Sequence, residues 1–290
     1  MIMNIVEELD LAIKAKETGS TAGGYSVAYK GTTLHKPAYM TNDEWVTFLD
    51  AMPSNIRKEY ENGDGGELTE KDGRPPKMAS YGSSSRMIYN LSKHKIDFHY
   101  EMQLPTTIGG KANLDGFFSD GNRSVFIEAK CHEPYTAKKN SVSPRYADLY
   151  KYLNAHNSGG LHIEMQPSKC GRYMNTDYFV GMEKIERFDI KQMICHLLGI
   201  ATGILKGTLQ QNKIDFLYLL YDPTSLPLPA QVHSEITDIY QKTCRECNLI
   251  HFPAIFEDIL AFLSAHLGTQ ATPCHFNFTL VSQDDYQKML

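Results

Sequence analysis

Two acidic side chains and one lysine stand close together near the middle of the chain, in a pattern suited to phosphate chemistry. Asp115 lies in one apolar stretch, and Glu128 and Lys130 lie two positions apart at the end of the next. Carboxylate oxygens are preferred ligands of Mg²⁺, and an ammonium group stabilises negative charge that develops on a phosphoryl group. Our first hypothesis for these three residues is therefore a metal-dependent site that cleaves phosphodiester bonds.

The three side chains share one face if the stretch folds as a β-hairpin with an even loop. The segments on either side of Asp120-Gly121 are rich in aliphatic and aromatic residues, and Asp-Gly is itself a hairpin signal. With these two residues as the loop, Asp115 lies diagonally across from Glu128, at roughly 7–8 Å along the backbone. Because side chains alternate along a strand, any even loop keeps Lys130 on the same face, with room for one divalent cation between the carboxylates.

The composition is that of an ordinary globular protein. The 290 residues include 42% hydrophobic and 22% charged residues, enough for one large or two small domains. The net charge of −5 gives no overall basic footprint, so contact with nucleic acid would need a local basic groove. The start of the chain lacks a basic signal-peptide region, no apolar run is as long as a membrane span, and the six cysteines show no disulfide framework. We therefore expect a cytoplasmic protein without a membrane partner.

The hydrophobic pattern indicates a helical extension followed by a mixed α/β domain. Helices are predicted over residues 4–16, 41–49, 54–61, 83–93, 189–207, 230–247 and 254–267. Strands are predicted over residues 96–104, 112–119, 123–130, 214–221, 249–252 and 275–281. The Gly-, Pro- and charge-rich residues 62–77 suggest a linker. We therefore expect an N-terminal helical extension and linker over residues 1–77 and a second domain over residues 78–290, with an insertion over 131–187.

The predicted insertion is polar and locally basic. It holds eight Lys or Arg residues against six Asp or Glu, a net charge of +2, and six of the 17 tyrosines. Basic residues interleaved with aromatic ones suit a surface that follows phosphates and stacks on bases. The alternative is an ordinary solvated insertion, because charge runs usually lie at the surface. Within it, a helix near residues 145–154 and a strand near 161–165 are weakly indicated.

Polar residues on two other elements are candidates to support the site. Gln192 and His196 lie four positions apart on the helix predicted to begin at Asp189, and therefore share one face. The alternative is a polar stripe packed beside the sheet or facing solvent. Glu101, on the first predicted strand of the α/β domain, could add a carboxylate.

The cysteine motifs indicate neither zinc nor a thiol nucleophile. Cys244 and Cys247 form a lone C-x-x-C pair, whereas structural zinc needs four ligands, so two helix cysteines are the better interpretation. Cys131 is followed directly by His132, but a catalytic cysteine needs a positioned base, and the sequence does not identify one.

The order of predicted elements and the acidic pattern resemble the PD-(D/E)xK nuclease superfamily. Asp115 matches the family's Asp, and Glu128 and Lys130 match its Glu-x-Lys. Residues 83–91 and 192–199 are similar to a bacterial, restriction endonuclease-like subgroup, and the resemblance covers roughly residues 83–221. It implies a restriction endonuclease-like core, in which a central mixed β-sheet is flanked by helices in the order α-β-β-β-α-β.

The resemblance also implies roles for these residues. Asp115, Glu128 and the backbone carbonyl of Ala129 would bind Mg²⁺ or Mn²⁺, Lys130 would act on the water or the transition state, and Gln192 would support the site. The implied activity is that of an endonuclease, a hydrolase that cleaves DNA. RNA is the alternative substrate. A homodimer would suit an enzyme that cuts both strands.

Three features depart from the family pattern. Leu114 precedes the aspartate where the pattern has proline, Arg86 stands where some members have an acid that could bind a second metal, and the insertion of about 57 residues is long. Long loops are usually functional.

Two other functions compete with this hypothesis. A catalytically inactive nucleic-acid-binding or scaffold protein could retain the fold, although an inactive descendant has no reason to keep three charges on a sheet. An α/β enzyme acting on a small phosphorylated molecule would need a glycine-rich phosphate loop after a strand, and the sequence has none.

Overall fold

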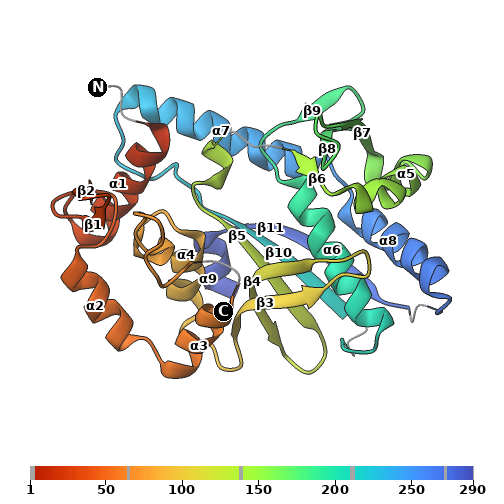
Figure 1. The fold of residues 1–290 in the computed structure, drawn as a ribbon, viewed down its shortest axis with the longest axis horizontal. Coiled ribbons are helices and arrows are strands. Elements are labelled where there is room, and N and C mark those ends of the chain that lie inside the picture. The colour runs from red at the N-terminus through yellow and green to blue at the C-terminus, as the bar shows by residue number, and fades with distance from the viewer. Residues whose placement is uncertain (1–3, 64–65, 137–139, 210–212, 271–272, 290) are drawn as a thin grey trace.

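A five-stranded mixed sheet forms the centre of the protein (Figure 1). The computed structural model describes residues 4–63, 66–136, 140–209, 213–270 and 273–289. The sheet has the order β11-β10-β5-β4-β3, in which β3, β4 and β5 pair antiparallel and β10 and β11 run parallel to β5. Its strands are β3 (His99–Pro105), β4 (Lys111–Ser119), β5 (Ser124–Lys130), β10 (Lys213–Leu220) and β11 (His275–Ser282).

Helices cover both faces of this sheet, which confirms a mixed α/β fold. One hydrophobic core contains Ile127 of β5 and Ile88 of helix α4 (Ser84–Ser92). The other contains Phe126 of β5 together with residues of α6 (Ile190–Leu205) and α8 (Phe252–Leu267). Because neighbouring side chains of β5 point to opposite faces, this fully buried strand contributes to both cores.

The N-terminal part packs against the same core as α4. It contains α1 (Ile5–Thr18), β1 (Tyr25–Tyr29), β2 (Thr32–Lys36), α2 (Asn42–Ala51), α3 (Ser54–Asn62) and η1 (Lys77–Ala79). Three of these helices were predicted, and Thr41 and Glu44 form the capping box that begins α2. The β1–β2 hairpin was not predicted. The division into an extension and a second domain stays a prediction, but Leu9 and Trp45 share a core with Ile127 of the sheet.

The predicted insertion contains a second, four-stranded sheet. Its elements are η2 (Glu133–Tyr135), β6 (Ser141–Val142), η3 (Pro144–Tyr146), α5 (Ala147–Ala155), η4 (Ser158–Gly160), β7 (Leu161–Pro167), β8 (Met174–Val180) and β9 (Glu183–Ile185). The sequence indicated only α5 and β7. Residues 137–139, which include two of the insertion's lysines, lie outside the described residues.

Three of the six tyrosines of the insertion are buried and cannot form an exposed stacking surface. Tyr135, Tyr150 and Tyr178 are buried, and the hydroxyls of Tyr150 and Tyr178 lie 3.1 Å apart in a hydrogen bond. Tyr173 is 53% exposed. The hypothesis that basic and aromatic side chains of the insertion form one exposed nucleic-acid-binding surface is therefore wrong for these three tyrosines.

In the C-terminal part, the strand predicted over residues 249–252 was wrong. Residues 249–251 join α7 (Ala230–Asn248) to α8, which begins at Phe252, and the side chains of Ile250 and Phe252 are buried in the second core. Helix α9 (Gln283–Met289) follows β11. Cys244 and Cys247 lie on α7, as predicted. Within the described part of the chain, no single helix has the length and apolarity to cross a bilayer; α7 and α8 satisfy this test only as a pair bent by 51°.

Candidate active site

The hairpin that carries the predicted site has a longer loop than expected. The last pair of strands β4 and β5 is Ser119 with Ser124, so the loop has four residues and not two. The Asp120 carboxylate accepts hydrogen bonds from the backbone N–H groups of Asn122 and Arg123, both at 3.1 Å, which fixes the wider turn. Four is also an even number, so the predicted sharing of a face is kept. The diagonal placement was wrong, because this register, continued by two pairs beyond Phe117 and Phe126, puts Asp115 opposite Glu128.

The two strands part at the predicted site. Their pairing ends at Gly116 and Ile127, just before Asp115 and Glu128. Across the opening, the carboxylate of Asp115 accepts a hydrogen bond of 2.7 Å from the backbone N–H of Ala129. We call this opening between β4 and β5 the fork. At the fork, a side-chain hydrogen bond replaces a backbone one and fixes one oxygen of Asp115 against β5.

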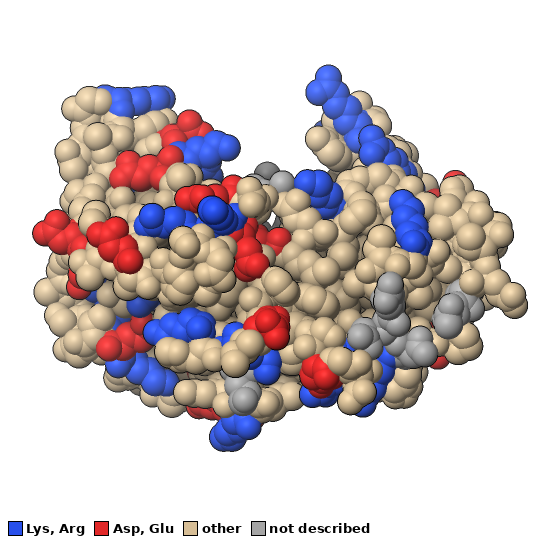
Figure 2. All heavy atoms as spheres, turned by 90° about the horizontal axis from the view of Figure 1, so that it is seen from below, with Lys and Arg blue, Asp and Glu red and all other residues tan. Residues whose placement is uncertain are grey.

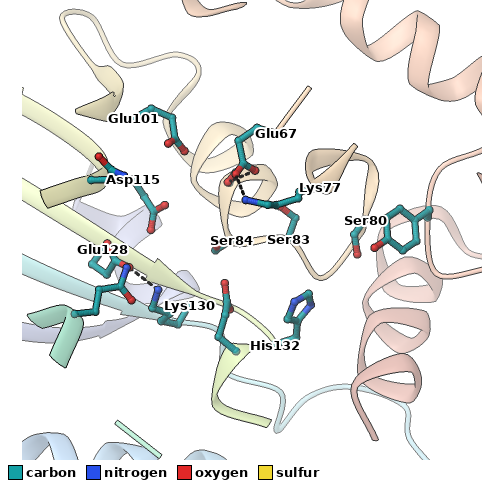
Figure 3. A pocket seen from close by; sticks show the side chains of 15 residues that line it. Glu67, Lys77, Ser80, Ser83, Ser84, Glu101, Asp115, Glu128, Lys130 and His132 are labelled. Atoms are coloured by element: carbon teal, nitrogen blue, oxygen red, sulfur yellow. Dashed lines mark hydrogen bonds and ion pairs between the residues drawn. The ribbon is translucent and has the colours of Figure 1, made fainter. Parts of the chain in front are cut away.

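A cavity of about 410 Å³ opens at this fork (Figure 3). Asp115, Glu128 and Lys130 line it from the sheet, and Gln192 lines it from α6. The structure therefore brings together the four side chains that were predicted to be catalytic. Ala129 lies between two of them in the sequence, and its carbonyl as a metal ligand stays a prediction.

Glu128 and Lys130 form a buried ion pair, which accounts for their pKa shifts. Nζ of Lys130 lies 2.5 Å from Oε1 of Glu128, and the two side chains are 9% and 3% exposed. Burial acts to raise the pKa of Glu128, but the charges of Lys130 and His196 outweigh burial and lower this pKa to about 2. Burial acts to lower the pKa of Lys130, and the Glu128 charge raises it well above its ordinary value. Both groups are therefore charged at neutral pH.

His196 confirms that the polar face of α6 points toward the site. Its Nε2 lies 2.9 Å from Oε2 of Glu128, and its ring is 2% exposed. The two atoms lack the alignment of a directed hydrogen bond, so this Glu128 oxygen is buried without a hydrogen-bond donor in the structure. Close packing makes the contact possible: a Cβ added at Gly199 would lie 2.7 Å from Cβ of Ala112 on β4. The solvent-facing alternative for this stripe is excluded.

Asp115 differs from Glu128 in its electrostatics. Burial first, and then the negative charge of Glu128, raise the pKa of Asp115 well above its usual value. The pKa values of the two carboxyl groups at the fork are thus shifted in opposite directions, that of Asp115 upward and that of Glu128 downward. Such divergence is common at catalytic sites because closely spaced like charges cannot both ionise cheaply.

Strand β3 is distorted next to Asp115. Glu101 has a φ of +53°, unusual for a residue with a side chain, and Tyr100 and Met102 on either side of it face different cores. A Cβ added at Gly63 would lie 3.0 Å from Oε2 of Glu101, so a glycine there leaves room for this side chain. Glu101 lines the cavity, as the sequence suggested it could. Backbone strain of this kind often accompanies a functional position.

Arg86 takes no part in lining the cavity. Its guanidinium pairs with Glu17 at 2.8 Å and lies 4.4 Å from the ring centroid of Tyr81, so it ties α4 to α1. Glu67 and Lys77, by contrast, line the cavity although the sequence placed them in a linker. Residues 64 and 65, which lie shortly before Glu67 in the sequence, are outside the described residues. No spacing in the sequence could have identified them, because the contact joins segments that are distant along the chain.

The donor set at the fork fits a hard divalent cation in part. Carboxylate oxygens are suitable ligands, and the Glu128 oxygen without a donor is a position that a cation would satisfy. Among the described residues, no group of three or more His, Cys, Asp or Glu side chains is arranged to hold a metal ion. Water and substrate phosphate would complete the shell, as is usual for Mg²⁺.

Comparisons with family models, with curated proteins and with solved structures found no match to this chain.

His132 links the edge of the cavity to the N-terminal helix α1. Its Nδ1 lies 3.2 Å from the buried carboxylate of Asp10, which also accepts a hydrogen bond of 3.3 Å from Ser80. Burial acts to lower the pKa of His132, but the contact with Asp10 and the charge of Glu133 raise it above 6.5. This pairing makes His132 a candidate for pH-dependent stabilisation of the N-terminal part.

We expect His132→Gln to reduce the pH dependence of folding stability. A raised pKa in the folded state stabilises the protein fully below the unfolded value, and the stabilisation is lost as pH rises through the folded value. The free energy of unfolding, measured in urea from pH 5.5 to 8.5, should therefore fall more steeply in the wild type than in the variant. His266→Gln, which replaces an exposed histidine of α8, is the control. Parallel curves for wild type and His132→Gln would contradict the assignment.

Proposed function

We propose that this chain is a metal-dependent nuclease that hydrolyses DNA phosphodiester bonds. The observation that carries the proposal is the joint placement of Asp115, Glu128 and Lys130 in one cavity where β4 and β5 part. The order α4, β3, β4, β5, α6, β10 agrees with that of the PD-(D/E)xK nucleases. We therefore infer a restriction endonuclease-like core.

Asp115 and Glu128 would hold Mg²⁺ or Mn²⁺, together with the Ala129 carbonyl. When bound, the cation would polarise a phosphoryl oxygen and lower the pKa of a water ligand. The backbone N–H of Ala129 donates a hydrogen bond of 2.7 Å to the Asp115 carboxylate and so fixes one of its oxygens beside the position proposed for the cation. The lowered pKa of Glu128 keeps its carboxylate ionised, and a cation bound at Oε2 would share this oxygen with His196, whose Nε2 lies 2.9 Å away.

Lys130 would serve the reacting phosphate directly. An ammonium group has three N–H donors, and the contact with Glu128 uses one. The others can orient the attacking water or stabilise the charge that develops on the phosphoryl oxygens. In a buried site this stabilisation is stronger than in water. Gln192, which lines the cavity from α6, would position the substrate or the water.

The distribution of surface charge agrees with a polyanionic substrate. Figure 2 shows a face hollowed between two raised parts, with Lys and Arg side chains on both sides of the hollow and Asp and Glu side chains gathered on its left side. Lys and Arg side chains on both sides of the hollow could attract a phosphate backbone locally, although the protein has a net charge of −5. DNA is the substrate of this proposal, with RNA as the other substrate, and a homodimer would suit an enzyme that cuts both strands.

Cleavage of a supercoiled plasmid tests the proposal. With Mg²⁺ or Mn²⁺ the wild-type protein should nick the plasmid, and Lys130→Met should reduce the rate about a hundredfold or more, as loss of a transition-state donor does in other enzymes. Lys206→Met, an exposed residue after α6, is the matched control and should cut at the wild-type rate. Equal rates for Lys130→Met and wild type would refute the site.

Plasmid binding separates the two remaining functions. A gel-shift measurement under the same conditions would show retarded plasmid for a nuclease and for an inactive binding protein alike. Retardation without nicking, in either metal, would favour the inactive nucleic-acid-binding protein. Neither binding nor nicking would favour a different substrate class altogether.

A further inference from the structure

The N-terminal part of the chain builds one wall of the cavity. Glu67, Lys77 and Ser80 face the fork from the side opposite β4 and β5 (Figure 3), and Tyr39 also lines the cavity. Lys77 and Lys130 are the two lysines among the described residues that line the cavity, and they come from its two sides. A substrate that reaches Lys130 therefore passes a wall that carries Lys77.

Glu67 holds the Lys77 ammonium in place. Nζ of Lys77 lies 2.8 Å from Oε1 of Glu67, and Oε2 of the same carboxylate accepts a hydrogen bond of 2.8 Å from Ser85 of α4. The Glu67 side chain is 7% exposed, whereas that of Lys77 is 63% exposed. The carboxylate is thus anchored inside the protein, while the lysine keeps most of its surface, and two of its three N–H donors, available.

The charges around the cavity make this lysine significant. Five carboxylate residues line it, Glu67, Glu101, Asp115, Glu128 and Glu133, against the two lysines. Such a cavity repels a polyanion except where a fixed cation or a bound metal compensates. Glu67 neutralises part of the Lys77 charge but also prevents the flexible side chain from moving away, which lowers the entropy lost when it binds an anion.

We infer that Lys77 forms a second phosphate-binding position in this cavity, which holds the nucleic-acid backbone at a phosphate next to the one that is cut. The inference rests on the proposed nuclease function and deepens it. It assigns to the N-terminal part a direct contact with substrate, and it makes Glu67 the residue that positions the contact. The competing role for Lys77 is purely structural, as the partner of a buried carboxylate.

Lys77→Gln separates these two roles. The glutamine amide still donates a hydrogen bond to Glu67, so a structural role is preserved, whereas the charge that binds phosphate is lost. In plasmid cleavage we expect KM to rise about tenfold and kcat to stay within about twofold, because the lost contact is made equally in ground and transition states. Lys71→Gln, an exposed lysine of the same segment that does not line the cavity, is the matched control.

The salt dependence of binding gives a second readout that does not need cleavage. Binding of a short fluorescein-labelled DNA duplex, followed by anisotropy without added metal, should show a slope of log K against log salt that is smaller by about 0.9 in Lys77→Gln. Lys71→Gln should keep the wild-type slope. Thermal melting by circular dichroism checks that each variant is folded.

Each outcome bears on one of the two proposals. Unchanged KM and unchanged slope in Lys77→Gln would overturn the phosphate position, and so would a fall in kcat at constant KM. A wild-type protein that binds DNA without cutting it, and loses slope in Lys77→Gln, would support the phosphate position while the nuclease proposal fails. A wild-type protein that neither binds nor cuts would overturn both.

Discussion

Glu128→Gln is expected to abolish nicking of plasmid DNA and to destabilise the fold. The glutamine loses the charge that would bind the metal, which contributes several kcal/mol to such reactions, so the rate should fall about a thousandfold. It also leaves the ammonium of Lys130 buried without its carboxylate. Breaking one side of a buried ion pair costs about 3–5 kcal/mol, so the free energy of unfolding in urea should fall by about 3 kcal/mol.

Two further variants test the cause of these effects. Glu257→Gln, on the exposed face of α8, makes the same chemical change far from the cavity and should alter neither quantity. The double variant Glu128→Gln with Lys130→Met removes both charges, so it should regain most of the lost stability and none of the cleavage. A Glu128→Gln protein as stable as the wild type would show that the pair is not buried as described.

The shared face of the three site residues could be predicted because it depends on one property of strands, the alternation of side chains. The loop was two residues longer than expected, yet Asp115, Glu128 and Lys130 still met, since only the parity of the loop matters. A single local periodicity was also sufficient for α6, where a spacing of four residues predicted that Gln192 and His196 share a face. The contact of His196 with Glu128 then followed from the packing of that helix on the sheet.

The N-terminal wall of the cavity could not be predicted in this way. Glu67 and Lys77 stand in a segment rich in glycine, proline and charge, which is the composition of a linker. Their position depends on contacts with α4, formed through Ser85, and not on any local period. Of the four strands of the insertion's sheet, β6, β8 and β9 were not predicted. Half-exposed strands such as β8 carry polar residues that weaken the hydrophobic alternation.

The distortion at the fork explains why the charges gather where they do. The β3–β4 ladder has no pair between Tyr100–Gly116 and Met102–Leu114, which is where Glu101 and Asp115 lie. Glu101 has a positive φ, the β4–β5 ladder ends just before Asp115, and both side chains line the cavity. The site therefore depends on an irregular backbone, held in place by the two cores on either side of the sheet.

Asp115→Asn is expected to abolish cleavage while making the protein more stable at alkaline pH. The asparagine can still accept the hydrogen bond from the Ala129 N–H, but it removes a buried carboxyl that repels Glu128. Because the pKa of Asp115 is raised in the folded state, the wild type binds its proton more tightly when folded and loses stability as pH rises from the unfolded pKa through the folded one. The variant has no such loss.

Melting temperatures of the metal-free proteins at pH 5 and pH 8 measure this effect. The variant should gain stability relative to the wild type between pH 5 and pH 8, and its nicking at pH 8 should fall about a thousandfold. Asp238→Asn, an exposed residue of α7, should match the wild type in both measurements. The substitutions Glu128→Gln and Asp115→Asn are therefore expected to have opposite effects on stability and the same effect on cleavage.

A carboxylate whose removal stabilises the fold is retained for function and not for stability. If Asp115→Asn were less stable than the wild type at pH 8, Asp115 would be a structural residue, and the main support for the proposed site would be lost.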